Sequence, residues 1–400
     1  MPYFKNFVGV LWFSLIIGNV NFTPGGLLRF VEATSSPSPK FICYFTSWST
    51  NRTGPARFKI SDIPSSACTH IVYSFAVLNS TSLTMDLSAE VDRALIDQVT
   101  TLRSNGTKVS VALGGWADSE NGTKYSTMIN HGHLRTNFVH ESVKFLRRHG
   151  FDGIDLDFEY PTCWWGNCST GPVTDKNNFA NLIHELRAAY RFYGLLVSVA
   201  VAGDVEIVKL AYDMPRIARN VDWIGVMTYD LHSTLSGKTG HHSPYMGPHP
   251  NTVDSLDYWI NQGDVPPSKL VMGIPLYGRS FTLKDTTVHG VGAPAGQGKA
   301  GSFTEEAGFL AYFEFCGAGW SHVEISGVGS YALRGDQWVS YNDVSLLEQK
   351  MKHVLQYRLG GVMVWALDLD DFNAQFCNQG RYPLITAMKN ALSSSKNSTV

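Results

Sequence analysis

The sequence has little charge for its 400 residues: charged residues make up 16% of the chain and the formal net charge is −2. It contains no basic run, which argues against a nucleic-acid partner and against an anionic membrane surface. No C-x-x-C zinc pattern occurs, and no internal repeat of roughly 20 to 50 residues. Because 44% of the residues are hydrophobic, the chain can bury one large core. The composition favours a folded protein that binds a small or neutral ligand.

The first 33 residues are typical of a secretory leader. Lys5 precedes the apolar run FVGVLWFSLII, which at roughly a dozen residues is too short to span a bilayer comfortably. Cleavage between Gly18 and Ala33 is expected to release an extracellular protein with no membrane attachment, and an uncleaved anchor is the alternative. Composition divides the rest of the chain into a Pro/Ser linker over residues 34–40, a folded region over 41–392 and a disordered tail over 393–400.

Glycosylation motifs and cysteines agree with export. The six cysteines form an even set, so disulfide bonds are expected. Cys163 and Cys168 enclose the short segment CWWGNC and are the easiest pair to assign, although sequence alone leaves fifteen connectivities for the set. The N-x-S/T acceptors outside the leader are Asn51, Asn79, Asn105, Asn121, Asn167 and Asn397.

Short apolar runs alternate with segments of helical period along the chain. Most runs are almost continuously hydrophobic, as expected for parallel strands that are covered on both faces. Between two of them, residues 175–191 place Phe179, Leu182 and Ile183 on one face, with Asp175 as the expected helix cap. The pattern predicts an α/β fold of the (β/α)8 TIM barrel type. The eight runs lie at residues 41–46, 70–78, 108–113, 153–158, 195–201, 222–228, 270–275 and 361–366.

The interval between the seventh and eighth runs is irregular. Residues 278–343 contain glycines, aromatics and alternating segments such as RSFTL, LAYFEF and QWVSY. This pattern predicts a small α+β insertion domain within the barrel, beside its mouth.

The fourth run lies within FDGIDLDFEYP, residues 151–161, and carries three carboxylates at alternate positions. Side chains alternate faces along a strand, so Asp155, Asp157 and Glu159 are expected to point into the barrel. Carboxylates about 6–7 Å apart in a confined space cannot all ionise cheaply, so at least one pKa should rise. Glu159 lies nearest the C-terminal end, where barrel active sites open, and is the candidate general acid.

Two other interpretations of this acidic row are weaker. A solvated charged face is disfavoured by the intervening Ile154, Leu156 and Phe158 and by the following Pro161. A divalent-metal site would use carboxylate oxygens, but the acids lie on one rigid strand rather than on a ligand loop. Acid/base chemistry by paired carboxylates is therefore the favoured interpretation.

The chain resembles the family 18 glycoside hydrolases, the chitinases, in motifs that follow one another in order. FDGIDLDFEYP matches the family's D-x-x-D-x-D-x-E signature. ICYFTSW resembles its first strand, VALGGW its third, VMTYDLHS its sixth, GIPLYGRSF its seventh and GGVMVWALDLDDF its eighth, while FLAYFEFC resembles its insertion domain. The resemblance covers the chain from about Phe41 to Leu392.

The resemblance implies a retaining hydrolysis in which the substrate's own 2-acetamido oxygen replaces an enzyme nucleophile. Glu159 would protonate the glycosidic oxygen and later activate water. Asp157 would hold the acetamido N–H, and Asp155 would share a proton with Asp157. Tyr229 would bind the acetamido carbonyl. Asp152 begins the motif and is expected to be structural. Neither a metal nor an organic cofactor is implied.

The same resemblance implies a sugar-binding cleft in a monomer. Pyranose faces stack on flat aromatic rings, and Trp365 is expected to form the floor at the cleavage point. Burial in the core is the alternative for Trp48, and whether Trp164 and Trp165 extend the cleft stays open. The expected substrate-binding residues are Tyr44, Trp48, Phe75, Gly115, Trp116, Tyr160, Met227, Asp230, Tyr277, Arg279, Glu314 and Trp365. The implied disulfides are Cys43–Cys68, Cys163–Cys168 and Cys316–Cys377.

One departure from the family pattern bears on the acids. Ala112 stands where the third-strand motif commonly has Ser, so the buried carboxylates are expected to lose a hydrogen bond and their pKa values to shift.

The sequence therefore predicts a secreted chitinase acting on β-1,4-linked N-acetylglucosamine in chitin or chitooligosaccharides. A silent chitin-binding lectin of the same fold is one alternative, and an endo-β-N-acetylglucosaminidase acting on N-glycans is another. Glu159 argues against the lectin, because a silent relative is expected to lack the acid there.

Overall fold

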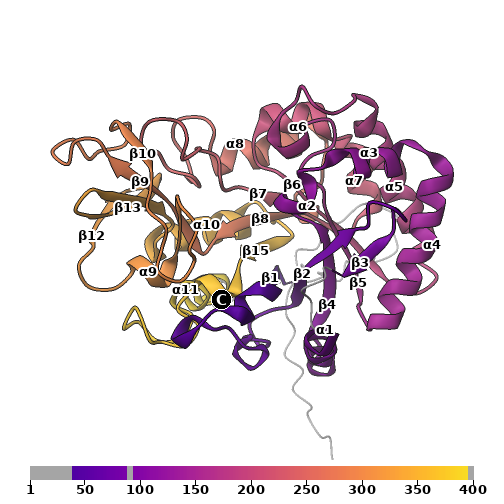
Figure 1. The fold of residues 1–400 in the computed structure, drawn as a ribbon, viewed down its shortest axis with the longest axis horizontal. Coiled ribbons are helices and arrows are strands. Elements are labelled where there is room, and N and C mark those ends of the chain that lie inside the picture. The colour runs from indigo at the N-terminus through magenta and orange to yellow at the C-terminus, as the bar shows by residue number, and fades with distance from the viewer. Residues whose placement is uncertain (1–37, 88–92, 395–400) are drawn as a thin grey trace, which may run out of the picture. The chain divides into compact units, whose positions relative to one another are not determined.

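Eight parallel strands close into a barrel in the computed structural model, which describes residues 38–87 and 93–394 (Figure 1). β1 pairs with both β2 and β15, which closes the ring. The predicted (β/α)8 barrel is confirmed. In order around the ring, the strands are β1 (Lys40–Thr46), β2 (His70–Leu78), β4 (Lys108–Gly114), β5 (Gly153–Asp157), β6 (Leu196–Ala202), β7 (Trp223–Met227), β8 (Leu270–Pro275) and β15 (Gly361–Trp365).

The first strand begins one residue before the predicted boundary. Lys40, expected in the linker, pairs with Gly361 of β15, and its N–H donates to the Gly360 carbonyl (2.9 Å). Barrel closure therefore orders a residue that composition alone assigns to a linker. The predicted leader at 1–33 and the glycosylation motif at Asn397 lie outside the described residues.

Helices cover the outside of the barrel, with their apolar faces against the strands. α5 buries Phe179, Leu182 and Ile183, the face predicted from the sequence. Asp175 is not the helix cap: it lies in the first turn, and its carboxylate accepts hydrogen bonds from Ser126 (2.7 Å) and other side chains. Within the described ranges, no helix combines the length and apolarity needed to cross a membrane. The helices are α1 (Arg93–Thr100), α2 (Trp116–Ser119), α3 (Gly122–Asn130), α4 (Gly132–His149), α5 (Thr174–Tyr190), α6 (Val205–Ala211), α7 (Met214–Asn220), α8 (Thr252–Asp257), α9 (Tyr312–Phe315), α10 (Val344–Gln356) and α11 (Pro383–Ser394).

A second sheet, antiparallel throughout, occupies the predicted insertion between β8 and β15 (Figure 1, orange). It has a small core of its own, in which the fully buried Trp338 stacks on Tyr331 with ring centroids 4.9 Å apart. Only Leu276 separates the end of β8 from its first strand, so the sheet begins at the carboxyl end of the barrel. The strands are β9 (Tyr277–Leu283), β10 (Ala295–Gln297), β11 (Phe309–Ala311), β12 (Ser321–Ile325), β13 (Gly329–Arg334) and β14 (Gln337–Tyr341). In the barrel sheet, β3 (Met85–Leu87) pairs antiparallel with the end of β2.

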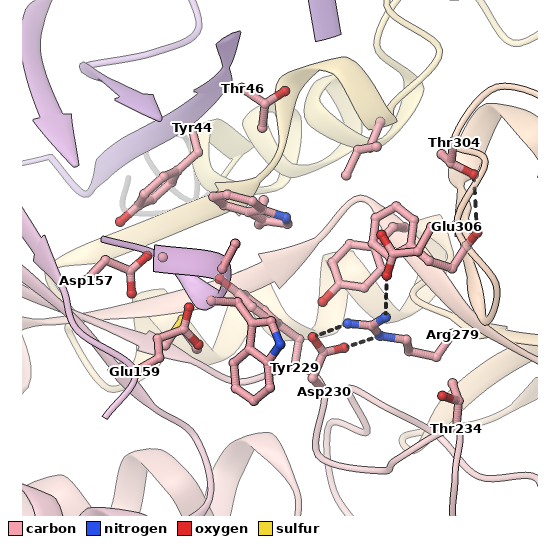
Figure 2. A pocket seen from close by; sticks show the side chains of 18 of the residues that line it. Tyr44, Thr46, Asp157, Glu159, Tyr229, Asp230, Thr234, Arg279, Thr304 and Glu306 are labelled. Atoms are coloured by element: carbon pink, nitrogen blue, oxygen red, sulfur yellow. Dashed lines mark hydrogen bonds and ion pairs between the residues drawn. The ribbon is translucent and has the colours of Figure 1, made fainter. Parts of the chain in front are cut away.

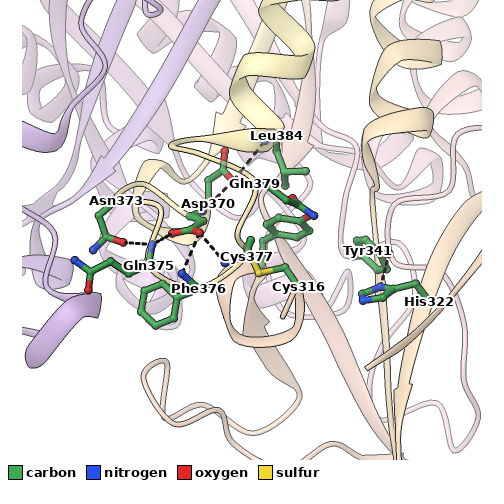
Figure 3. Close-up of a disulfide and its surroundings, with 12 residues drawn as sticks. Cys316, His322, Tyr341, Asp370, Asn373, Gln375, Phe376, Cys377, Gln379 and Leu384 are labelled. Carbon is green, nitrogen blue, oxygen red and sulfur yellow. Dashed lines mark hydrogen bonds between the residues drawn. A yellow bond between two sulfur atoms is a disulfide. The ribbon is translucent and has the colours of Figure 1, made fainter. Parts of the chain in front are cut away.

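All three predicted disulfides are present. One joins β1 to the segment before β2, one closes the loop after β5, and one ties the insertion to the segment after β15 (Figure 3). They are Cys43–Cys68, Cys163–Cys168 and Cys316–Cys377.

Two buried carboxylates shape the segment after β15. Asp371 accepts the backbone N–H of Cys377 (2.8 Å), and so orders the turn that carries the disulfide. Asp370 accepts the N–H of Ile385 (3.1 Å) at the start of α11. The helix continues to Ser394, past residue 393 where the tail was predicted to begin, because Leu392 is buried and the Ser394 hydroxyl bonds back to the preceding turn.

Candidate active site

A cavity of about 1130 Å³ opens at the carboxyl ends of the barrel strands (Figure 2). The carboxyl ends of all barrel strands meet on this face, which is where barrel active sites form. Its lining combines residues at the ends of β1, β4, β5, β6, β7 and β15 with residues of the insertion. The volume exceeds the roughly 300–1,000 Å³ of sites for small ligands, so the cavity can hold several sugar-sized rings.

The acidic row on β5 lies at this cavity. Asp155, Asp157 and Glu159 are buried, with exposures of 0%, 4% and 8%. Asp157 and Glu159 line the cavity on one side, facing away from the strand toward Tyr229 and Asp230 (Figure 2), whereas Asp155 does not reach the lining. Within residues 38–87 and 93–394, no group of three or more His, Cys, Asp or Glu side chains could hold a metal ion.

The two cavity-lining acids hold their protons unusually tightly. Burial raises the pKa of Glu159 to about 8, with Tyr160 opposing the shift and Asp230 adding to it. Burial, with the charges of Glu159 and Asp155, raises the pKa of Asp157 well above its usual range. Oδ1 of Asp157 is buried and has no hydrogen-bond partner among the described residues. Glu159 can therefore donate a proton near neutral pH, whereas one oxygen of Asp157 has unused hydrogen-bonding capacity.

Asp155 is held by hydroxyl groups from two other strands. Tyr44 on β1 donates to Oδ2 (2.6 Å), and Ser198 on β6 donates to Oδ1 (2.5 Å). Burial raises the pKa of Asp155, and both hydrogen bonds oppose that shift. The expected loss of a hydrogen bond at Ala112 is therefore offset: Ala112 of β4 pairs with Asp155 on one side, and Ser198 supplies a hydroxyl from the other.

Close packing explains the glycines that follow β4. A Cβ at Gly114 would lie 2.3 Å from the carbonyl oxygen of Asp157. A Cβ at Gly115 would lie 2.6 Å from the Phe75 ring, and the backbone φ of +81° at this position favours glycine. The two glycines let β4 approach the acidic strand closely and place Trp116 at the edge of the cavity.

An ion pair joins the insertion to the barrel across the cavity. Arg279 of β9 donates to both oxygens of Asp230 at 2.7 Å, and Glu306 lies 3.6 Å from the same guanidinium (Figure 2). Burial would raise the pKa of Asp230, but Arg279 and the buried His242 outweigh burial and hold that pKa well below its usual range. Asp230 is therefore a fixed anionic acceptor beside the acids.

Aromatic rings cluster along one wall of the cavity. The Trp365 ring lies 5.5 Å from Tyr44, 5.7 Å from Phe75 and 6.3 Å from Trp48, between centroids. Trp48 is 45% exposed and lines the cavity, which excludes burial in the core for this residue. Flat apolar faces of this kind are the surfaces on which pyranose rings stack.

A second aromatic pair lies at another edge of the cavity. Trp116 lines the cavity and stacks on Trp165 at 5.3 Å and 29°, and the two are 48% and 47% exposed. The backbone N–H of Trp165 donates to the backbone carbonyl of Glu159 (2.8 Å), which ties the disulfide loop to the backbone of the acid. Trp164 turns away, and its Nε1 donates to Asp175 (2.9 Å). Trp165 therefore adjoins the cavity, whereas Trp164 does not line it.

Glu314 is not where a substrate-binding residue would lie. It does not line the cavity, and its carboxylate accepts the backbone N–H of Phe303 (2.7 Å), the N–H of Ala311 (3.0 Å) and the hydroxyl of Thr304 (2.7 Å). The prediction fails because nearby donors in the insertion already form hydrogen bonds with both oxygens of the carboxylate. Glu314 lies on α9 and, through these hydrogen bonds, holds the loop of residues 302–306, which lines the cavity.

Most of the other predicted residues meet at the cavity. Asp152, at the far end of β5, instead forms ion pairs with Arg103 (3.0 Å) and Lys108 (3.3 Å), as a structural residue would. The predicted residues that line the cavity are Tyr44, Trp48, Phe75, Gly115, Trp116, Asp157, Glu159, Tyr160, Met227, Tyr229, Asp230, Tyr277, Arg279 and Trp365.

Sequence analysis missed several polar residues of the site. Asp368 lines the cavity, where it accepts the Thr46 hydroxyl (2.6 Å) and pairs with Arg52 (2.7 Å). Its position inside the segment that resembles the family's eighth strand was a usable signal. Ser198 was visible as the one hydroxyl in the apolar run LLVSVAV. Glu306 lies in a loop without a motif, so no local pattern indicated it.

Together, a barrel with buried acids at its carboxyl end and a cavity walled by exposed aromatics defines a site for carbohydrate. The chain belongs to the glycosyl hydrolases family 18, whose family model matches residues 40–370. The resemblance stated from the sequence is confirmed.

Individual relatives agree with this assignment. The chain is 44% identical over 394 residues to probable chitinase 10 of Drosophila melanogaster, covering 92% of this chain but only 17% of that relative. It is 40% identical to catalytic domain 2 of the Ostrinia furnacalis Group II chitinase, with a TM-score of 0.86 and coverage of 89% and 96%; a mutant of that domain is solved with (NAG)5 bound. It is 32% identical to human YKL-39, a pseudo-chitinase with retained chitooligosaccharide binding, with a TM-score of 0.81 and coverage of 89% and 100%.

Proposed function

We propose that the protein is a chitinase that hydrolyses β-1,4 linkages between N-acetylglucosamine units by a substrate-assisted, retaining route. The observation that carries the proposal is Glu159, a buried carboxyl at the cavity whose pKa burial raises to about 8. Such a group is protonated at neutral pH and can give its proton to a leaving oxygen.

In the first step, Glu159 donates its proton to the glycosidic oxygen, and the bond from this oxygen to C1 breaks. The carbonyl oxygen of the substrate's 2-acetamido group attacks C1 and forms a cyclic oxazolinium ion. Asp157, which lines the cavity, would accept the acetamido N–H and stabilise the positive charge. Tyr229, which lines the same cavity, would donate to the acetamido carbonyl.

In the second step, the carboxylate of Glu159 takes a proton from water as the water oxygen attacks C1. The oxazolinium ring opens, the acetamido group is restored and Glu159 regains its proton, so the cycle closes. Two displacements at C1 give a product with the configuration of the substrate.

Aromatic side chains would hold the sugar chain in register. Trp365, with Tyr44 and Phe75 packed against it, offers a flat face close to the acids. Trp48 and Trp116 line other parts of the cavity and would stack on sugars away from the cleavage point. Asp230 and Arg279 would bind hydroxyl and acetamido groups along the edge.

A silent chitooligosaccharide-binding protein is the second candidate, favoured by the similarity to human YKL-39. Incubation with chitin hexasaccharide, followed by chromatography of the products, decides between the two. We expect shorter oligosaccharides that initially carry the β-anomer at the new reducing end. Bound but uncleaved hexasaccharide between pH 4 and pH 8 would establish the silent candidate instead.

An endo-β-N-acetylglucosaminidase would cleave the core of an N-glycan. Incubation with a glycoprotein bearing N-glycans, read by mass spectrometry, tests this activity with the same preparation. We expect no release of glycans under conditions in which the hexasaccharide is cleaved.

We also infer that the protein is exported and acts as a monomer without a metal or organic cofactor. Support comes from the three disulfides and from exposed glycosylation motifs at Asn51, Asn121 and Asn167. Expression in a eukaryotic cell line, with mass measurement of protein from the medium, tests export, glycosylation and oligomeric state together.

A further inference from the structure

One of the glycosylation motifs forms part of the cavity wall. Asn51, Arg52 and Thr53 make up the acceptor sequence N-R-T, and all three residues line the cavity. Asn51 and Thr53 are exposed, and the Thr53 hydroxyl does not cap the turn that follows it. Among the acceptor asparagines whose side chains the structure describes, Asn51 is the one that lines the cavity.

The local backbone places Asn51 beside an aromatic ring of the cavity wall. Asn51 and Trp48 belong to one short 3-10 helix, η1 (Ser47–Asn51), which follows β1. Such a helix has three residues per turn, so side chains at positions i and i+3 lie on the same face, roughly 6 Å apart along the axis. Trp48 is 45% exposed and lines the cavity. The amide of Asn51 therefore lies one turn away from an exposed aromatic ring.

The residue between Asn51 and Thr53 anchors the motif. The Arg52 side chain is 12% exposed and pairs with the buried Asp368 at 2.7 Å. The carbonyl of Ser49 accepts the backbone N–H of Arg52 (3.4 Å), which holds the last turn of η1. A group attached to Asn51 would therefore be carried by an ordered part of the cavity wall.

We propose that Asn51 carries an N-glycan whose first sugars lie against Trp48 and compete with substrate for that end of the cavity. This inference rests on the proposed function, both for export and for chitin as the substrate. The first two sugars of an N-glycan are N-acetylglucosamine units in β-1,4 linkage, which are also the unit and the linkage of chitin. An aromatic ring able to stack on chitin can therefore stack on the glycan core as well.

Attachment to Asn51 makes a weak contact effective. A ligand joined to its site by a short flexible connection has an effective concentration of about millimolar. A long oligosaccharide must displace the glycan to reach Trp48, whereas a short one bound beside the acids does not. The glycan would therefore lower the affinity for long chains and leave the affinity for short chains nearly unchanged.

The first measurement is the modification itself. The full chain is expressed in a eukaryotic cell line, and peptides of the secreted protein are analysed by mass spectrometry. We expect a glycan on Asn51, and an unmodified Asn51 overturns the inference. In that case, glycans on Asn121 or Asn167 in the same sample would show that the proposed export still holds.

The second measurement is affinity as a function of chain length, read by tryptophan fluorescence in an E159Q background that prevents cleavage. T53A destroys the motif but keeps Asn51. We expect it to raise hexasaccharide affinity about 3–10-fold, the value of one aromatic contact, and to change trisaccharide affinity less than about twofold. N121Q, which removes an exposed motif outside the cavity lining, should match E159Q alone, as should T53S with its glycan present. An unchanged ratio of the two affinities in T53A overturns the inference.

A double variant tests the contact with Trp48. If the glycan competes for this ring, T53A should add nothing to the hexasaccharide affinity of W48A, and an equal gain with and without Trp48 overturns the inference. N51Q removes the same glycan through the other required residue, and it decides the matter if T53A does not fold. All these readouts are of binding. A parent that binds but never cleaves would therefore overturn the proposed hydrolase and still allow this test.

Discussion

Arg279 holds Asp230 through two parallel hydrogen bonds, Nε to Oδ1 and Nη2 to Oδ2, both at 2.7 Å. The two residues belong to different parts of the chain: Arg279 lies on the first strand of the insertion, and Asp230 follows β7. The pair therefore fixes the wall made by the insertion relative to the acids on the barrel.

Replacing Asp230 with Asn tests this link. The side chains are 24% and 41% exposed, so solvent screens part of the attraction, and we expect a loss of about 1 kcal/mol and a Tm lower by a few degrees. The kcat/KM for chitin hexasaccharide should fall about tenfold, because Arg279 and the insertion loop lose their alignment. E185Q is the matched control, since it breaks the Arg135–Glu185 pair (2.9 Å) between α4 and α5. A D230N variant that behaves like E185Q in turnover would contradict the role given to this pair.

The variant Glu159→Gln removes the transferable proton and keeps nearly the same volume. Turnover should fall by at least ~10²–10⁴-fold, the range attributed to a general acid or base. Binding of chitin tetrasaccharide should survive, since the aromatic wall and Asp157 are unchanged. E348Q, which alters an exposed glutamate on α10, should match the parent in both measurements. Retained turnover in E159Q would move the assignment to another acid.

The raised pKa of Glu159 predicts a stability difference that depends on pH. Its pKa of about 8 in the folded protein lies above the ordinary value of 4.5, so the folded state binds this proton more tightly. The stabilisation from Glu159 is full below pH 4.5 and is lost as pH rises through 8. The Tm of E159Q minus that of the parent should therefore grow from pH 4 to pH 9. Thermal melts at five pH values measure it, and a constant difference would show that the carboxyl is not buried as described.

The same pKa predicts the alkaline limb of activity. As pH rises through about 8, Glu159 loses the proton needed for the first step, so kcat should fall there. Initial rates on a soluble chitin oligosaccharide across pH 4 to 10 give the profile. An alkaline limb below pH 6 would contradict the assignment of Glu159 as the acid.

The stacked pair Trp116–Trp165 predicts coupled effects on long substrates. Replacing Trp165 with Ala should weaken binding of chitin hexasaccharide about 3–10-fold, as expected for one aromatic contact, and affect the trisaccharide less. If Trp165 acts by supporting Trp116, the double variant W116A/W165A should be no worse than W116A alone. F192A, which removes a 74% exposed ring, is the control. Additive losses would show instead that Trp165 binds sugar independently.

The disulfides should differ in their contribution to stability according to the length of chain that each closes. Cys163 and Cys168 are 5 residues apart, and Cys316 and Cys377 are 61 apart. Loop-closure entropy gives about 2 kcal/mol for the short loop and about 4 kcal/mol for the long one. Urea unfolding of C163S/C168S and of C316S/C377S measures both, and a larger loss for the short loop would contradict the entropic account.

Much of the barrel could be predicted because its pattern is local. Residues Ile154 to Phe158 alternate apolar and acidic side chains, and the two-residue period of a strand puts the acids on one face whatever the rest of the chain does. The apolar runs recur with segments of helical period between them. This pattern predicts a barrel, in which that face of the strand is buried. A raised pKa in the acidic row, found at Glu159, could be predicted for the same reason.

The errors at Glu314 and Asp175 have a common physical cause. Each carboxylate was assigned a role from its position along the chain, in a motif or at a helix start. In the structure, Glu314 is taken up by backbone donors of a folded loop, and Asp175 by side chains of α3 and the disulfide loop. Packing determines which donors are free near a buried carboxylate, and the position of the carboxylate along the sequence does not reveal these donors.

By itself, the amino-acid sequence determined the strand periodicity, the acidic row and the identity of the residues able to stack on sugars, because these follow from covalent geometry and side-chain chemistry. Only the tertiary structure decided which hydroxyls hold Asp155, since its partners Tyr44 and Ser198 lie 111 and 43 residues away in the chain. It also decided that Trp165 faces the cavity edge while Trp164 turns to Asp175. These choices depend on which strands become neighbours when the barrel closes, and barrel closure is a property of the whole chain.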